Sequence, residues 1–318
     1  MDRINKVKKR FQSAQLLLIG VAIIWGLNPT IVKIGLEGIT SYTFNLARHI
    51  VAVITCWIFF LIIEKSWKIE RKDIKIVLLL GFLGYFVYQY FYIVGVSHTT
   101  AGNTSLIFAT LPSIVALING VFKIEKLNKG IVLGIIISFI GIIQIVVGTG
   151  KQISIFDNYF VGNIMIFLGT TTWAIYTIMN KKLLEKYSPI KLSTYGVTVG
   201  TIFMILTWPK ALFVQNWSIV SIKSILAIIY SGAFSVTIAA ILWNLGVKKI
   251  GSTRTSLYNN ITPIISVLCG ILLLNEKFRF LQGVGAILIF GGLYITKEGK
   301  IKKTDNNFID TKKYIVKK

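Results

Sequence analysis

The chain has 318 residues, of which 54% are hydrophobic and only 15% are charged, and its formal net charge is +23. A soluble domain averages about 25% charged residues, so this chain carries too little charge to cover a water-facing surface. The composition therefore excludes an ordinary soluble domain and predicts a membrane protein, in which the surplus of Lys and Arg reflects where those residues lie along the chain.

Ten mostly apolar runs follow one another along the chain. A bilayer core about 30 Å thick needs about 20 such residues per helix, so each run predicts a transmembrane helix. The first run follows a basic segment without a small-residue cleavage site, which favours an uncleaved helix over a signal peptide. The sequence thus predicts an all-α polytopic membrane protein of ten transmembrane helices. The expected spans are 13–34, 42–63, 74–95, 101–122 and 129–148, followed by 159–180, 191–209, 224–246, 252–274 and 279–296.

The chain contains one pattern twice, at an offset of 151 residues. Pro112 corresponds to Pro263 and Glu125 to Glu276, although proline and acidic residues are scarce in this sequence. Such matched positions indicate an internal duplication. The predicted segments are a basic cytoplasmic N-terminus at 1–12, a first five-helix repeat at 13–150, a second at 151–297 and a basic cytoplasmic tail at 298–318.

Lys and Arg are divided unequally between the two sides of the predicted membrane. With the N-terminus inside, the inner segments carry 28 of the 35 basic residues and the outer segments carry 5. This bias predicts cytoplasmic termini, and it explains the basic charge without a nucleic-acid partner. Because five is an odd number, the second repeat enters the membrane from the opposite side. Inverted repeats are common in secondary transporters, which bind substrate near the midplane; the alternative is that duplication produced only a stable bundle.

Several short stretches resemble a known family. They are Ile24-Trp25-Gly26, the stretch 111–125, Trp173-Ala174-Ile175-Tyr176 and Asn275-Glu276-Lys277, although Glu125 and Glu276 lack the glycine that usually precedes this glutamate. Over roughly residues 14 to 297 the chain resembles the ten-helix, EamA-type members of the drug/metabolite transporter superfamily. The resemblance implies a plasma-membrane carrier, often an exporter of amino acids or related metabolites.

Polar and aromatic side chains within the apolar runs are the candidate substrate-binding groups. Such groups need a partner or water, and a midplane cavity would supply both. Tyr85, Tyr88 and Tyr92 have the spacing of one helix face. The alternatives are an aromatic belt at the membrane interface or hydrogen bonds between helices. The candidate substrate-binding residues are Trp25, Asn28, Arg48, Tyr88, Tyr92, Asn103, Trp173, Tyr176, Trp243, Tyr258 and Asn259.

Charged residues are rare within the expected helices. Arg48 lies seven residues into an apolar run, where a charge costs about 2.5–3.5 kcal/mol on insertion scales. It could pair with a substrate carboxylate, or it could bind backbone carbonyls and fix the packing. Lys33, near an outer helix end, is expected to extend to the interface. None of the twelve acidic residues falls in the middle of an expected helix, which leaves exchange or facilitated diffusion as an alternative to ion coupling.

Glycine and proline positions predict how the helices pack and bend. Matched glycines in the fifth and tenth helices let the two helices approach closely, or form a dimer contact. Pro112 and Pro263 predict matched kinks. The glycines are Gly134, Gly141, Gly285 and Gly292.

The sequence predicts a carrier, with export as the expected direction, for a small organic metabolite such as an amino acid. The expected partners are the substrate and the lipid bilayer, with a homodimer left open and nucleic acid not expected. No cofactor, metal or catalytic residue is expected, because no paired carboxylates, Ser/His/Asp or Cys/His grouping or metal-ligand spacing is found; the chain is not expected to be an enzyme. The alternatives are an exporter of lipophilic cations, which would favour a buried carboxylate, and a membrane sensor or assembly partner.

Overall fold

The computed structural model describes residues 2–123, 129–148 and 157–295. Within these ranges all regular elements are helices and no strand occurs. Nine of the helices in the described ranges are long and apolar enough to cross a membrane, and the apolar helix Phe280–Ile295 is shorter. The predicted all-α polytopic class is confirmed, while the count of ten spans and their inverted orientation stay predictions.

The first half contains five of these spans, close to their expected positions. The first helix begins at Asp2, so the segment expected as the N-terminus continues the first span as helix. The third span runs from Arg71 to His98 in three segments, and the fourth is divided just before Pro112. The elements are α1 (Asp2–Gly35), α2 (Ser41–Ile63), α3 (Arg71–Phe82), η1 (Leu83–Val87), α4 (Tyr88–His98), α5 (Ala101–Phe108), α6 (Leu111–Val121) and α7 (Lys129–Val147).

The second half repeats this order with a longer connection after its second span. Its third span is again divided into three segments, and its fourth is again broken before a proline. The elements are α8 (Asn158–Lys186), α9 (Pro189–Thr207), α10 (Ala211–Val214), η2 (Trp217–Ile219), α11 (Ile222–Tyr230), η3 (Ser231–Ala239), α12 (Ala240–Ile250), α13 (Ser252–Ser256), η4 (Leu257–Ile261) and α14 (Thr262–Leu274), followed by the helix Phe280–Ile295.

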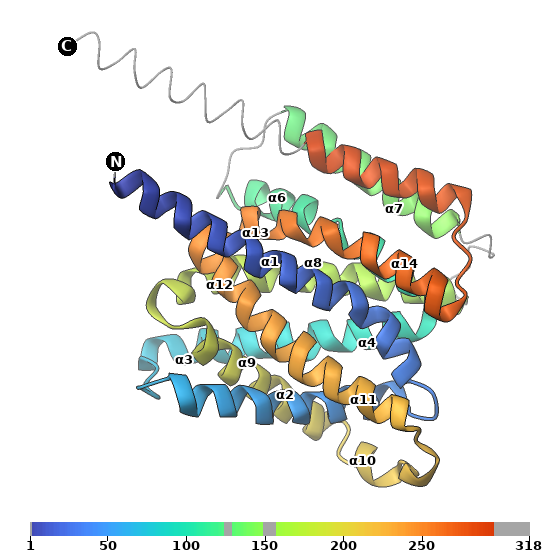
Figure 1. Cartoon of the computed structure of the whole chain (residues 1–318), viewed down its shortest axis with the longest axis horizontal. Coiled ribbons are helices and arrows are strands. Elements are labelled where there is room, and N and C mark those ends of the chain that lie inside the picture. Colours follow the sequence, from blue (N-terminus) through green and yellow to red (C-terminus); the bar gives the residue numbers. More distant parts are fainter. Residues whose placement is uncertain (1, 124–128, 149–156, 296–318) are drawn as a thin grey trace.

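Helices of the two halves alternate in space. α1 lies beside α12 and α14, and α4 lies beside α8 (Figure 1). α2 packs on both α9 and η3. Each half therefore completes the packing of the other, and the boundary between the halves runs through the centre of the molecule.

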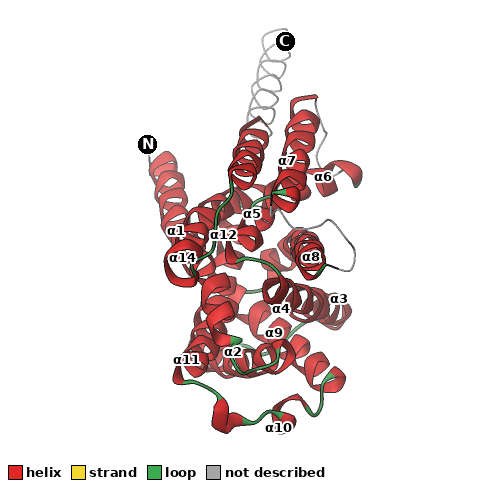
Figure 2. Ribbon diagram, turned by 90° about the vertical axis from the view of Figure 1, so that its right-hand side faces the viewer, coloured by secondary structure: helices red, strands yellow, loops and turns green. Residues whose placement is uncertain are grey.

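The fifth helix of the first half pairs with the last described helix, at one end of the molecule (Figures 1 and 2). A Cβ atom on Gly141 would lie 2.7 Å from the Gly285 carbonyl oxygen, and one on Gly285 would lie 2.7 Å from the Gly141 oxygen. The backbones touch because neither residue has a side chain. The predicted packing between the fifth and tenth helices is therefore confirmed.

Hydroxyl caps and one carboxylate define the helix starts. Thr100 accepts a hydrogen bond from the Asn103 amide at the start of α5. The same helix start receives Glu276, whose Oε1 accepts from the Ala101 amide at 2.8 Å and whose Oε2 accepts from the Gly102 amide at 3.2 Å. A carboxylate at a helix N-terminus satisfies amides that have no partner within the helix. The repeated glutamate is thus a structural cap here; its counterpart Glu125 lies outside the described residues.

Irregular helix segments occur at matching positions in the two halves. The π-helical segment η1, shifted by the repeat offset, becomes 234–238, which falls inside the π-helical η3. The turn at 109–110 becomes 260–261, where η4 ends. Both breaks come just before the matched prolines, so the predicted kinks are confirmed. π-Helical turns are rare and occur mostly near functional sites.

The predicted orientation can be tested by cysteine labelling. In a background without Cys56 and Cys269, a Lys277→Cys protein should react with an impermeant maleimide on intact cells. Lys68→Cys, also at an exposed position, should react only after permeabilisation, because the basic inner segments are retained in the cytoplasm. Labelling of position 277 only after permeabilisation would contradict the inverted-repeat topology.

Candidate functional site

Two adjoining cavities lie where elements of both halves meet. The first encloses about 30 Å³ and the second about 20 Å³, which is room for one or two water molecules. The boundary between the halves therefore holds a small space that would have to widen to admit a ligand. Five residues contribute to both walls: Trp25, Asn28, Tyr88, Tyr92 and Ser235.

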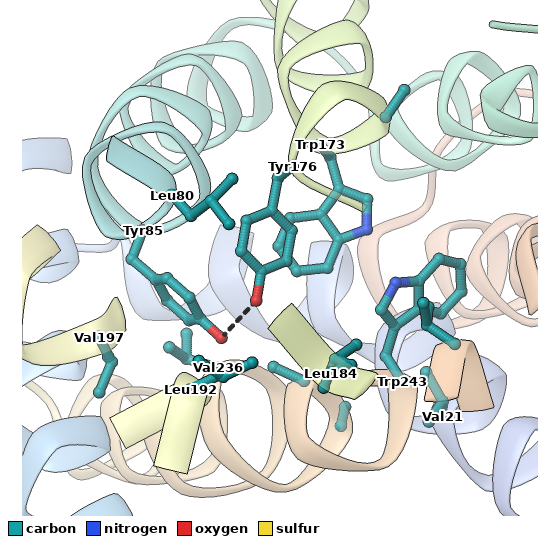
Figure 3. Close-up of a cluster of buried hydrophobic side chains, with 14 of the residues drawn as sticks. Val21, Leu80, Tyr85, Trp173, Tyr176, Leu184, Leu192, Val197, Val236 and Trp243 are labelled. Carbon is teal, nitrogen blue, oxygen red and sulfur yellow. Dashed lines mark hydrogen bonds between the residues drawn. The ribbon is translucent and has the colours of Figure 1, made fainter. Parts of the chain in front are cut away.

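Aromatic rings form much of the cavity wall. The Trp173 ring lies 4.9 Å from Tyr88 and 5.7 Å from Trp25, measured between ring centroids. Behind this layer, Tyr176 stacks on Trp173 at 4.8 Å and Trp243 lies 5.0 Å from Trp25. Each such pair contributes about 0.5–1.5 kcal/mol beyond its buried area. The sequence-predicted aromatic residues therefore gather into one cluster, with Trp173, Tyr176 and Trp243 visible in Figure 3.

A pair of tyrosines lies beside the second cavity, which Tyr85 lines. The Tyr85 and Tyr176 hydroxyls are 3.4 Å apart (Figure 3). Tyr176 also accepts from the side-chain amides of Asn180 at 3.1 Å and Asn244 at 3.0 Å. Gly200 makes room for this arrangement, because a Cβ there would lie 2.5 Å from the Tyr85 backbone. Of these hydrogen bonds only the one between Tyr85 and Tyr176 crosses between the halves; the two amide bonds fix Tyr176 within the second half.

A second polar network lies near the junction of α4 and α5. The Gln282 amide donates to Asn103 Oδ1 at 2.6 Å, and the Thr99 hydroxyl donates to Asn163 Oδ1 at 2.7 Å. Lys33 Nζ donates to the Thr99 carbonyl oxygen at 2.6 Å. Lys33 thus binds the C-terminal end of α4, where free carbonyls at a helix end attract a cation.

Arg48 is fully buried, and its guanidinium is held by neutral oxygen atoms. Asn45 Oδ1 accepts from Nε at 2.9 Å and from Nη2 at 2.7 Å. Gln89 Oε1 accepts from Nη2 at 2.7 Å, and Ser231 Oγ accepts from Nη1 at 3.0 Å. A Cβ on Gly232 would collide with the Arg48 carbonyl oxygen. The glycine therefore lets η3 approach α2 closely enough for Ser231 to reach the guanidinium.

The hydrogen bonds continue from this arginine to the cavity wall. Ser231 Oγ donates to Asn28 Oδ1 at 2.9 Å, and Asn28 Nδ2 donates to the Tyr92 hydroxyl at 2.7 Å. The chain crosses from α2 through η3 and α1 to α4. It fixes the orientation of Asn28 and Tyr92, two of the residues that line both cavities.

The irregular segments present backbone carbonyls to the site. Trp25 Nε1 donates to the Ser235 carbonyl oxygen at 3.1 Å, within η3. Asn259 Nδ2 donates to the Phe108 carbonyl oxygen at 2.9 Å. Pro112 has no N–H, so it cannot bind the carbonyl four residues earlier, which is that of Phe108. The Asn259 amide thus replaces the helical donor that Pro112 lacks, and the Trp25 indole adds a donor to a carbonyl of η3.

The structure brings most of the predicted site residues together. Asn103 instead belongs to the network at the α4–α5 junction, Tyr176 and Trp243 lie behind the aromatic wall, and Tyr258 is half-buried beside the core. None of these four lines either cavity. The predicted residues that line one or both cavities are Trp25, Asn28, Arg48, Tyr88, Tyr92, Trp173 and Asn259.

Other lining residues were not predicted from the sequence. Gln89 was detectable as an amide within an apolar run, whereas the Ser235 carbonyl, which accepts from Trp25, leaves no sequence signal. Tyr85, which also lines the second cavity, was predicted to share a helix face with Tyr88 and Tyr92 but was not among the candidate binding residues. The other unpredicted lining residues are Pro29, Gln89, Thr104, Ser105, Phe108, Ser235, Val236, Ala240 and Thr262.

A helical membrane fold with a polar and aromatic cavity between two similar halves is the architecture of a carrier. The model of the EamA-like transporter family matches residues 12–147 and again 160–297. The chain belongs to this family, which places it in the drug/metabolite transporter superfamily. It is therefore a multi-pass membrane transporter of the EamA type.

Individual relatives agree with this assignment. YyaM of Bacillus subtilis, an uncharacterized transporter, is 27% identical over 87% of this chain and 95% of its own. An uncharacterized transporter of Archaeoglobus fulgidus is 29% identical over 85% of this chain and 94% of its own. A WAT1-related protein of Arabidopsis thaliana is 26% identical over 84% and 79%, respectively. A solved crystal structure with a TM-score of 0.67 and 14% identity covers 90% of this chain and 98% of its own, which supports the fold alone.

Proposed function

We propose that this protein is a secondary transporter that exports a small organic metabolite, such as an amino acid, by alternating access between its two repeats. It would act in the plasma membrane with both termini in the cytoplasm, as a carrier and not as an enzyme. The observation that carries the proposal is the pair of cavities at the boundary between the halves. Their walls come from α1, α2, η1, α4 and α5 on one side and α8, η3, α12, η4 and α14 on the other.

The contacts around the cavities favour alternating access. Tyr85 lines the second cavity, and its hydroxyl contacts that of Tyr176 from the other half. Their hydrogen bond is long, at 3.4 Å, and is exchangeable for bonds to water or to neighbouring amides. A relative movement of the halves would separate these two tyrosines while the network around Asn103 and Gln282 keeps the α4–α5 junction closed.

The proposal is tested with purified protein reconstituted into vesicles. A panel of radiolabelled metabolites that includes amino acids is screened, with unlabelled compound trapped inside to drive exchange. Protein-dependent, saturable accumulation of at least one compound supports a carrier. Absence of accumulation for every compound, with and without imposed proton and sodium gradients, would contradict it.

Removal of one aromatic ring should weaken substrate affinity. Tyr88→Ala deletes a ring that lines both cavities, and an aromatic contact contributes about 1 kcal/mol, or about fivefold in affinity. Tyr90→Ala is the matched control, because Tyr90 lies in the same helix but packs against Tyr42 and Trp208. Competition by unlabelled substrate in the vesicle assay measures the affinity. Equal affinity in the Tyr88 variant and the wild type would place binding elsewhere.

A further inference from the structure

The partners of Arg48 are unusual for a buried cation. Its side chain is 1% exposed, and the oxygen atoms around it belong to Asn45, Gln89 and Ser231. All three groups are neutral, and no ion pair to Arg48 is found among the described residues. A buried charge is ordinarily paired with an opposite charge, so this guanidinium is hydrogen-bonded but not neutralised.

Carboxylates elsewhere in the described part of the chain have other partners. Glu276 caps the start of α5 through two backbone amides. Asp73 forms a 2.9 Å ion pair with Lys186, and Glu64 lies 3.7 Å from Lys191. Each of these carboxylates already has its own partner within the described part of the chain, and none of them binds Arg48. The site therefore carries an uncompensated positive charge.

Aromatic rings pack against the guanidinium, and hydrogen bonds occupy most of its N–H groups. The Tyr92 ring covers it with its centroid 5.3 Å from Cζ, and the Phe44 ring lies 5.9 Å away. The four hydrogen bonds use four of the five N–H groups that an arginine has. Arg48 nevertheless contributes to the wall of the second cavity. A ligand would approach in the plane of the N–H groups, which is the direction from which a carboxylate binds arginine.

We propose that Arg48 is an anion-binding subsite of the cavity and that the transported compounds carry a carboxylate group. The carboxylate would receive the remaining N–H and replace the Ser231 hydroxyl as acceptor. The aromatic wall formed by Trp25, Tyr88 and Trp173 would hold the rest of the compound. The substrate class rests on the proposed transport function, whereas binding of a carboxylate at Arg48 does not.

The test measures binding by the purified full-length protein in detergent, through thermal unfolding and intrinsic tryptophan fluorescence. Two matched pairs of compounds are compared: benzoate with benzamide, and leucine with leucinamide. In the wild type each carboxylate should bind at least about tenfold more tightly than its amide. Arg48→Gln should reduce this preference to less than about threefold, and Arg48→Lys should leave an intermediate preference because it keeps the charge without the planar fork.

Lys33→Gln is the matched control, because Lys33 is a basic residue whose Nζ is bound to backbone carbonyls at the end of α4. It should keep the full preference for carboxylates. The comparison of acid with amide in the wild type needs no variant, so it tests carboxylate binding even where Arg48→Gln fails to fold. Equal affinity for acid and amide, or no binding of either carboxylate at millimolar concentration, overturns the subsite. So does a folded Arg48→Gln protein that retains the full preference.

The same compounds separate this inference from the proposed function. Carboxylates that bind through Arg48 but are not moved across vesicles would refute transport and leave the subsite intact. Transport restricted to compounds without a carboxylate, with affinity independent of Arg48, would refute the subsite and leave transport intact.

Discussion

Replacement of Gly292 by alanine is expected to destabilise the protein by about 3 kcal/mol, the upper part of the usual range for overpacking. A Cβ at this position would collide with the Gly134 carbonyl oxygen and with Ser138 Oγ, and it would lie 2.7 Å from the Ser138 amide nitrogen. Backbone atoms of α7 cannot move aside as the end of a flexible side chain can. The whole helix Phe280–Ile295 would therefore have to shift outward.

Gly291 provides the matched control within the same helix. A Cβ on Gly291 would meet no atom within 4 Å. Gly291→Ala should therefore be neutral or stabilising by up to about 1 kcal/mol, because alanine favours the helix over glycine. Thermal unfolding of the two variants in one detergent gives the comparison. Equal midpoints for Gly292→Ala and Gly291→Ala would show that the contact between the two helices does not limit stability.

The second large effect is expected from the amide that binds the broken helix of the other half. Asn259→Ala should cost about 1–3 kcal/mol, because the Phe108 carbonyl then remains buried without a donor. Asn260→Ala is the neighbouring control; its side-chain oxygen has no partner within the described residues, and its loss should cost little. Unfolding free energies of the two variants are compared under identical conditions.

A double-mutant cycle identifies the reason for the effect. Pro112→Ala restores an N–H that can donate to the Phe108 carbonyl. In that background Asn259→Ala should cost about 1 kcal/mol less than in the wild type, since the carbonyl keeps a donor. If the Asn259 substitution costs the same in both backgrounds, the amide stabilises the protein by another route.

Much of the fold could be predicted from the sequence because its signals are local. Apolar runs end near charged residues, so most helix ends fall within a few residues of those expected. The exceptions are α1, which begins earlier at Asp2, and α8, which continues to Lys186. Pro112 and Pro263 mark the breaks through their missing N–H. The π-helical segments could not be predicted, because an α-helical and a π-helical turn differ only in which carbonyl the N–H binds. That choice depends on tertiary packing, such as the close approach of Gly232 to Arg48.

The candidate site was predictable only in part. A polar or aromatic side chain in an apolar run must find a partner, which identified Trp25, Arg48 and Asn259. The same signal also selected Asn103 and Tyr258, since it does not say whether the partner lies in the cavity or in a separate network. The contribution of Ser235 could not be predicted, because any residue supplies a backbone carbonyl.

The matched irregular segments indicate that the architecture of the site is older than the duplication. A π-helical turn accommodates one more residue than an α-helical turn, and the two halves carry such turns at corresponding places, η1 and η3. Each half also carries a proline-linked break in its next span. If the halves had acquired these features after the duplication, the π-helical turn and the proline-linked break would each have had to arise twice at the same offset. The ancestral five-helix unit therefore already had a distorted third helix and a broken fourth helix before its gene was duplicated and fused. Two such units, paired as separate subunits, would have met at the same distorted helices that now border the cavity.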